Sequence, residues 1–185
     1  FHTPIYTQLH CENLYRSRTG KDFNLEHFFA NPEEYKSRFR KFTEIADIFI
    51  SCHYWDHNAD VLFNEEDTQS EKFNLKVIAD ITCDIKGSIP TTIRPSTIDN
   101  PIYGYNPESG EEGAPFSPAN ITIMAVDNLP CELPRDASVD FGTALIKNII
   151  PALIGNDSAS IINRASITKN GQLNRGYEYL EDYAS

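Results

Sequence analysis

The chain has 185 residues, of which 40% are hydrophobic and 23% are charged, so it can form one sizeable domain or parts of two. Its formal net charge of −11 at pH 7 argues against general binding to nucleic acids or anionic membranes, which requires an excess of Lys and Arg. No uninterrupted apolar run approaches the roughly 20 residues of a membrane-spanning helix, and no secretory signal pattern is visible.

The spacing of the four cysteines predicts free thiols. Cys11, Cys52, Cys83 and Cys131 lie far apart and form no C-x-x-C pair. This predicts a reducing compartment rather than a disulfide framework. We expect the protein in the cytoplasm, or in the mitochondrion of a eukaryote. Because the first residue is Phe1 and not Met, we also expect a processed form or a piece of a longer protein.

The N-terminal part is ambiguous up to Tyr15 and predicts a helix further along. Ile5–Leu9 shows the weak alternation of a strand. A helix is predicted from Asn31, where NPEE supplies a capping Asn, a Pro at the first helical position and an acidic third residue. Three aromatic side chains then follow at helical spacing and predict a core-facing side: Tyr35, Phe39 and Phe42.

Three short apolar runs, each ending in polar residues, predict buried strands. They are Ile48–Ile50, Lys76–Ile81 and Ile121–Val126. Alternation with helical segments indicates an α/β sheet covered on both faces. The Pro- and Gly-rich stretch 91–120 is either a lid-like functional segment or a plain surface excursion, with a possible hairpin strand at Ile102–Tyr105.

A long helix is predicted after the third strand. It begins near Leu133–Asp136, and Gly155 ends it. Pro151 is expected to kink it. Its apolar residues fall on one face: Leu145, Ile146, Ile149, Ile150 and Leu153. A shorter helical piece is predicted at Ile161–Ile167.

Polar side chains follow each predicted strand. Tyr54 follows the first strand, Thr82–Asp84 the second, and Asp127 with Asn128 the third. In a parallel sheet these ends share one edge, where ligands bind. Thr82–Asp84 therefore either faces a ligand, or Asp84 merely caps the next turn.

Other chemical patterns are absent or poorly spaced. The sequence has no G-x-S-x-G, no P-loop and no G-x-G-x-x-G phosphate-binding turn. His53 and His57 lie four residues apart, but on a strand end that runs into a loop, which disfavours a metal site.

Several longer stretches resemble one enzyme family. IADIFISCHYW, VIADITCDIKGSI and ITIMAVDNLPCELPRDAS are similar to the C-terminal half of lysine–ketoglutarate reductases and lysine-forming saccharopine dehydrogenases. These belong with the alanine dehydrogenase and transhydrogenase-like group. The resemblance covers nearly the whole chain after about Lys21, including NPEEYKSRF and ASITKNGQLNRGYEYL, and VDNLP followed by LPRDAS is its most specific element.

The resemblance implies a partial Rossmann-like parallel sheet with flanking helices. Residues 1–134 would form the second half of a dinucleotide-binding domain. Residues 135–185 would form a C-terminal helical segment that returns to a substrate domain. Lysine and 2-oxoglutarate would be interconverted with saccharopine by hydride transfer with NAD or NADP.

The resemblance also assigns site residues. Those lining the dinucleotide site would be Tyr54, Ile81, Val126, Asp127, Asn128 and Leu129. Those near the amino-acid substrate would be Thr82, Cys83 and Asp84. The acid and base of the family, a Lys and a His, belong to its N-terminal segment, so we expect no catalytic residue in this chain and no turnover by the chain alone.

The expected partners are a small amino-acid substrate and either a missing N-terminal half or a second copy, without nucleic acid or membrane. Two alternatives stay open: an alanine-dehydrogenase-like enzyme, and a non-catalytic module that binds a nucleotide or a protein.

Overall fold

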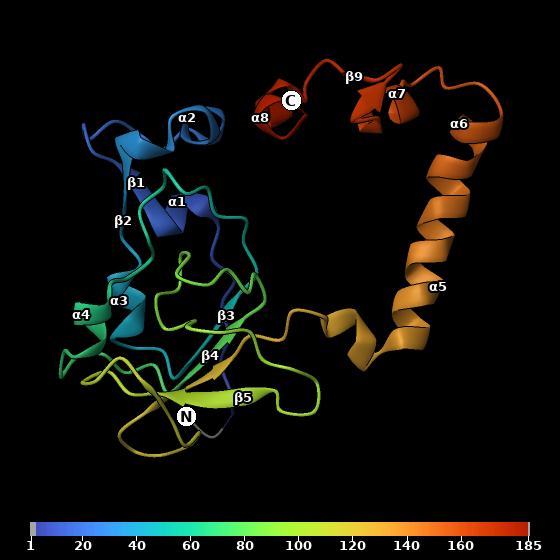
Figure 1. Ribbon diagram of the computed structural model, residues 1–185. Helices are drawn as coiled ribbons and strands as arrows, with labels where there is room; N and C mark the ends of the chain where they lie inside the picture. The colour runs from blue at the N-terminus through green and yellow to red at the C-terminus, as the bar shows by residue number, and fades with distance from the viewer. Residues whose placement is uncertain (1–2, 185) are drawn as a thin grey trace. The chain divides into compact units, whose positions relative to one another are not determined.

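The computed structural model describes residues 3–184 (Figure 1). The chain divides into two units, Phe1–Leu129 and Pro130–Ser185. The boundary predicted from the sequence lies after residue 134. The assignment of the two parts to a dinucleotide domain and to a substrate-domain segment stays a prediction.

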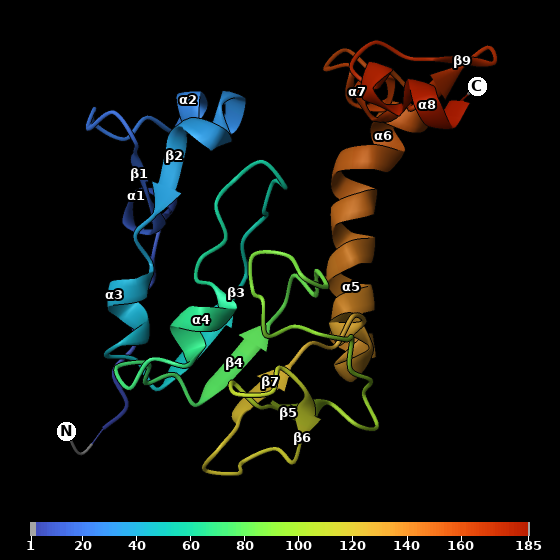
Figure 2. The same cartoon turned by 60° about the vertical axis from the view of Figure 1, so that its left-hand side comes forward.

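A five-stranded sheet is the centre of the first unit, in the order β3-β4-β7-β5-β6. The first three strands are parallel, and Figure 2 shows the arrows of β3 and β4 side by side. The last two form an antiparallel hairpin, as expected around Ile102. The bounds are β3 Ile48–Ser51, β4 Val77–Asp80, β5 Ile102–Tyr105, β6 Glu112–Gly113 and β7 Ile121–Met124. The protein thus has a partial Rossmann-like α/β fold.

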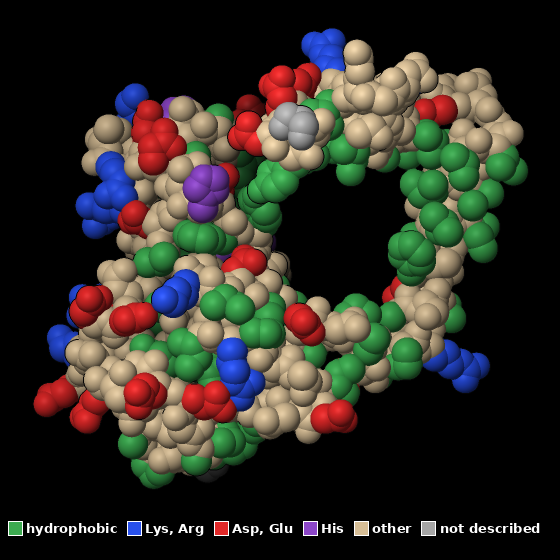
Figure 3. Space-filling model, in the orientation of Figure 1, with side chains coloured by type: hydrophobic (Ala, Val, Ile, Leu, Met, Phe, Trp, Pro, Cys, Tyr) green, Lys and Arg blue, Asp and Glu red, His purple; other side chains and the backbone are tan. Residues whose placement is uncertain are grey.

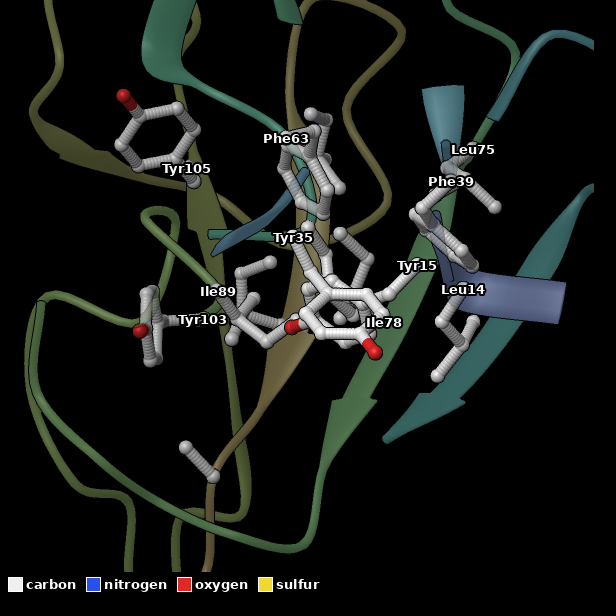
Figure 4. Packing of buried hydrophobic residues seen from close by; sticks show 14 of the residues in the cluster. Leu14, Tyr15, Tyr35, Phe39, Phe63, Leu75, Ile78, Ile89, Tyr103 and Tyr105 are labelled. Atoms are coloured by element: carbon white, nitrogen blue, oxygen red, sulfur yellow. The ribbon is translucent and has the colours of Figure 1, made fainter. Parts of the chain in front are cut away.

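The core lies against the two central parallel strands. Ile78 of β4 pairs in register with Ile123 of β7, and both side chains are fully buried. Figure 4 shows aromatic side chains from distant segments gathered on these strands, including Phe39, Phe63 and Tyr103. The rest of the chain covers the sheet unevenly, because the side chains of Ile48 and Ile50 of β3 are 61% and 60% exposed. The expectation of a first strand buried on both faces is therefore wrong for the residues described.

A small aromatic layer precedes the sheet. Its elements are α1 Cys11–Leu14, β1 Tyr15–Ser17, α2 Leu25–Ala30, the 3-10 helix η1 Pro32–Glu34, β2 Tyr35–Ser37 and α3 Arg40–Thr43. The strands β1 and β2 pair antiparallel, with Ser17 opposite Tyr35. No strand forms at Ile5–Leu9, so that prediction is wrong.

The helix predicted from Asn31 is also wrong beyond its first turn. The NPEE signal produces only η1, and the Asn31 side chain makes no capping bond there. Strand pairing with β1 then takes Tyr35 out of helical geometry. Tyr35 and Phe39 are nevertheless buried, as their apolar pattern predicts. The apolar pattern therefore predicts the burial of these two side chains correctly, but the helix that it predicts does not form.

The stretch between β4 and β7 is packed onto the sheet. The hydroxyl of Tyr103 accepts a hydrogen bond from the Ile93 amide at 3.1 Å and donates to the Thr91 carbonyl at 3.2 Å. The Arg94 guanidinium lies 4.4 Å from the Tyr103 ring centre and pairs with Glu112. These contacts tie the irregular chain to the hairpin.

A further short helix, α4 Glu65–Thr68, precedes β4.

The second unit begins with a long helical stretch. It comprises α5 Pro134–Ala144, the π-helical turn η3 Leu145–Ile149 and α6 Ile150–Ile154. Pro151 has no N–H to donate one turn back, and the Ile150 amide instead bonds to the Leu145 carbonyl. Gly155 ends the helix, as predicted. The remaining elements are α7 Ile161–Ala165, β8 Thr168–Lys169, β9 Gln172–Leu173, η4 Glu178–Leu180 and α8 Glu181–Ala184.

The stretch Pro134–Ile154 carries an exposed apolar surface. Within its 21 residues, an 18-residue window reaches a mean hydropathy of 1.3, enough by length and composition alone to cross a membrane. Polar residues interrupt this stretch, so no uninterrupted apolar run marks it in the sequence. Figure 3 shows hydrophobic side chains gathered along this helix. Core helices of soluble proteins can have the same length and composition, so one such helix is weak evidence for a membrane.

Candidate functional site

The carboxyl ends of β3, β4 and β7 meet at one edge of the sheet, as the sequence predicts. The Ile81 amide, just after β4, donates to the Ser51 carbonyl at the end of β3 at 2.9 Å. On the other side, the Cys83 thiol donates to the Ala125 carbonyl after β7 at 3.1 Å. The residues that follow all three strands are therefore neighbours. We call this edge, with residues 81–84 and 126–129, the strand-end edge.

A buried carboxylate shapes the strand-end edge. Asp80, the last residue of β4, has no exposed surface. One of its oxygens accepts hydrogen bonds from the Thr82 amide at 3.1 Å, the Thr82 hydroxyl at 2.6 Å and the Cys83 amide at 3.4 Å. Its other oxygen accepts from the Thr92 hydroxyl at 2.7 Å. Asp80 thus fixes the turn that presents Thr82, Cys83 and Asp84.

Cys83 sits in a left-handed conformation with φ of 54°, which only a well-determined turn imposes on a residue with a side chain. Burial raises the pKa of its thiol, and the negative charges of Asp80, Asp127 and Asp84 raise it further. The thiol is therefore protonated at neutral pH and is not a nucleophile. The same carboxylates give the strand-end edge a negative potential that suits an ammonium group.

The other predicted site residues differ in exposure. Asp84, Asp127 and Asn128 are exposed, and Ile81 is 38% exposed. Thr82 and Leu129 are half-buried. Val126 is only 3% exposed, and its backbone bridges to Ser96 in the irregular stretch. The Val126 side chain is therefore part of the core rather than a surface open to a ligand.

Tyr54 lies apart from the hydrogen-bonded turn, in the loop after β3. Its side chain is 88% exposed and borders a pocket of about 320 Å³. Next to it, His53 Nδ1 is 3.2 Å from the Ser51 hydroxyl, and His53 Nε2 is buried with no partner among the described residues. Burial lowers the pKa of His53, against the opposing influence of Asp80 and Asp84. Its ring is therefore neutral at pH 7.

Among residues 3–184, no group of three or more His, Cys, Asp or Glu side chains is arranged to hold a metal ion. His57 faces solvent and lies 3.8 Å from Asp56, separate from the buried His53.

Sequence reasoning missed Asp80, Thr92 and the pocket beside Tyr54. The signal for Asp80 was present, because it is the one charged residue within the apolar run Val77–Ile81. A carboxylate in such a run must be paired. Thr92 carried no comparable signal, since only the folded chain brings it to Asp80.

Known proteins resemble this chain over most of its length. No protein-family model matches. Alpha-aminoadipic semialdehyde synthase from Arabidopsis thaliana is 30% identical over 169 residues, which is 87% of this chain and 16% of that protein. The mitochondrial enzyme of the same name from Mus musculus is 28% identical over 178 residues, 81% of this chain and 19% of that protein.

The lysine-forming, NAD(+)-dependent saccharopine dehydrogenase from Yarrowia lipolytica is 30% identical over 129 residues, which is 67% of this chain and 32% of that protein. The chain thus spans less than a fifth of the two synthases and about a third of the dehydrogenase. Together with the parallel strands and their polar ends, these similarities place the chain in the family of alpha-aminoadipic semialdehyde synthases and lysine-forming saccharopine dehydrogenases.

Proposed function

We propose that the chain forms one side of the cleft of an oxidoreductase that interconverts lysine plus 2-oxoglutarate and saccharopine, with a nicotinamide dinucleotide as hydride carrier. The observation that carries this proposal is the strand-end edge, where three parallel strands end beside three carboxylates. Ligands of open α/β sheets bind at such an edge. The names of the dehydrogenase relatives supply saccharopine, NAD(+) and lysine, and the family resemblance supplies 2-oxoglutarate.

The residues at the edge fit the sugar and amino-acid parts of such ligands. The exposed Asp127 can accept hydrogen bonds from ribose hydroxyls, with Asn128 beside it. Asp84 can pair with a substrate ammonium group. Thr82 and Cys83 would line the amino-acid side, and Tyr54, Ile81 and Leu129 the dinucleotide side.

Other parts of the site would come from another segment. The sequence has no G-x-G-x-x-G turn to hold the pyrophosphate. The role of this chain is therefore binding and orientation, with NAD or NADP supplying the hydride chemistry when bound. We propose no catalytic residue in the chain and no turnover by the chain alone. In a eukaryote we propose a mitochondrial location, following the name of the mouse relative.

The test measures turnover and binding separately. Incubation with saccharopine and NAD should give no NADH absorbance, whereas thermal unfolding should shift upward with NAD or NADP, because a ligand that binds the folded state stabilises it. Asp127→Ala should reduce the shift, and Asp99→Ala, which changes an exposed carboxylate in the irregular stretch, should not. Turnover by the chain alone contradicts the proposed division of labour. The absence of any shift with NAD, NADP or saccharopine favours a non-catalytic module.

A further inference from the structure

We infer that the pocket between α1, α2 and the loop after β3 binds a planar aromatic ring of a small molecule. We call it the aromatic pocket. It lies entirely within the first unit, and its lining includes Tyr15, Phe28, Phe29, His53, Tyr54 and Trp55. The inference does not depend on the proposed function, although Tyr54 borders both sites.

Aromatic side chains dominate the lining. Tyr15 and Phe28 are buried, with ring centres 4.8 Å apart, and Phe29 lies 5.9 Å beyond Phe28. Phe29 and Tyr54, which also line the pocket, are 65% and 88% exposed. A planar ring entering the pocket would cover both of them.

The polar atoms of Tyr15 and Trp55 are already used. The Tyr15 hydroxyl donates to the Asp60 carbonyl at 3.0 Å, and Trp55 Nε1 donates to the same carbonyl at 3.3 Å. These two side chains therefore offer the pocket only their ring faces and edges. Water gains no hydrogen bond from these ring faces, whereas an aromatic ring gains stacking and edge contacts.

His53 also belongs to the lining, and its Nδ1 atom is 3.2 Å from the Ser51 hydroxyl. Its Nε2 atom is buried without a partner in the described residues, so it does not face the pocket. The lining therefore selects an occupant by contacts between rings rather than by this atom.

The volume limits the size of the occupant. About 320 Å³ lies at the lower end of the roughly 300–1,000 Å³ found for small-molecule sites. The pocket therefore suits a ring system of one or two rings. Such a ring can be the base of a nucleotide or a separate aromatic compound.

The pocket contains its own reporter, because Trp55 is the one tryptophan of the chain. Trp55 fluorescence is titrated with benzamide, with its saturated counterpart cyclohexanecarboxamide, and with adenosine. We expect a saturable change with benzamide, adenosine or both, and none with cyclohexanecarboxamide. Phe29→Ala should weaken binding about three- to tenfold, as loss of an aromatic pair does. Tyr6→Ala, which removes a 95% exposed ring outside the pocket, is the matched control.

The titration also separates the two sources of the ring. A benzamide signal that persists in saturating NAD assigns the pocket to a separate aromatic compound. An adenosine signal that NAD displaces assigns it to the base of a nucleotide. Both outcomes support the inference. No saturable change with either aromatic probe overturns it, as does an equal response to cyclohexanecarboxamide or an effect of Phe29→Ala no larger than that of Tyr6→Ala.

Discussion

His53 makes stability depend on pH through its burial. Its folded-state pKa lies below the ordinary value of 6.5, so on acidification the unfolded chain takes up a proton before the folded chain does. Stability from this group is full above the unfolded pKa and falls as pH decreases through it toward the folded pKa. Asp80 and Asp84 moderate the effect by favouring the charged ring.

We therefore expect His53→Gln to flatten the decline in unfolding free energy between neutral and mildly acidic pH. The change in the slope of unfolding free energy against pH stays below the limit of about 1.4 kcal/mol per pH unit for one titrating group. Urea unfolding at several pH values measures it. His57→Gln, which changes an exposed histidine four residues away, is the control and should retain the wild-type slope. Equal slopes in the wild type and in both variants would show that His53 does not cause the pH dependence.

Asp80 is a second residue on which the fold depends locally. Asp80→Ala would leave the buried Thr92 hydroxyl and the donors of the 82–83 turn without their acceptor. Each buried unsatisfied group costs about 1–3 kcal/mol, so we expect a loss of roughly 3 kcal/mol or more in unfolding free energy. Denaturant melts measure this. Asp99→Ala, at an exposed carboxylate, should cost less than about 0.5 kcal/mol. Similar stabilities of the two variants would contradict the role of Asp80.

At the scale of elements, local signals predicted some segments and failed where pairing partners decide. The strand Val77–Asp80 and the helix that Gly155 ends follow from apolar pattern and cap chemistry, and both are present. The capped NPEE start was equally good locally, yet Tyr35 continues into a strand because β1 offers an antiparallel partner. Non-local pairing of this kind overrides propensity and is invisible in a window of sequence.

The candidate site could likewise be predicted only in part from the sequence. Parallel order brings the three strand ends together, so the gathering of Thr82–Asp84 and Asp127 follows from the strand pattern alone. The aromatic pocket does not follow, because α1 and α2 approach the loop after β3 only in the folded unit. The roles of the site residues rest on the family resemblance and stay predictions.

At the scale of the whole molecule, the sheet ends in an unpaired strand. Among the described residues, β3 pairs only with β4, so its other edge offers free N–H and C=O groups. The exposed side chains of Ile48 and Ile50 lie on the same strand. Such an apolar edge templates pairing with another chain. We therefore expect the purified chain to associate, either with itself or with a segment that completes the sheet.

Light scattering over a range of concentrations tests this expectation. The chain alone should exceed the monomer mass, and Ile48→Lys with Ile50→Lys should weaken association at least about tenfold, since each buried Ile contributes about 1.5–3 kcal/mol. Both side chains already face solvent in the described chain, so the fold should tolerate the charges. Ile5→Lys, at another exposed apolar residue outside the sheet, is the control and should leave association unchanged. A monomer at every concentration would show that the β3 edge does not associate with a second copy. Association that survives the Lys variants would show that another apolar surface makes the contact, and the exposed helix Pro134–Ile154 is one candidate.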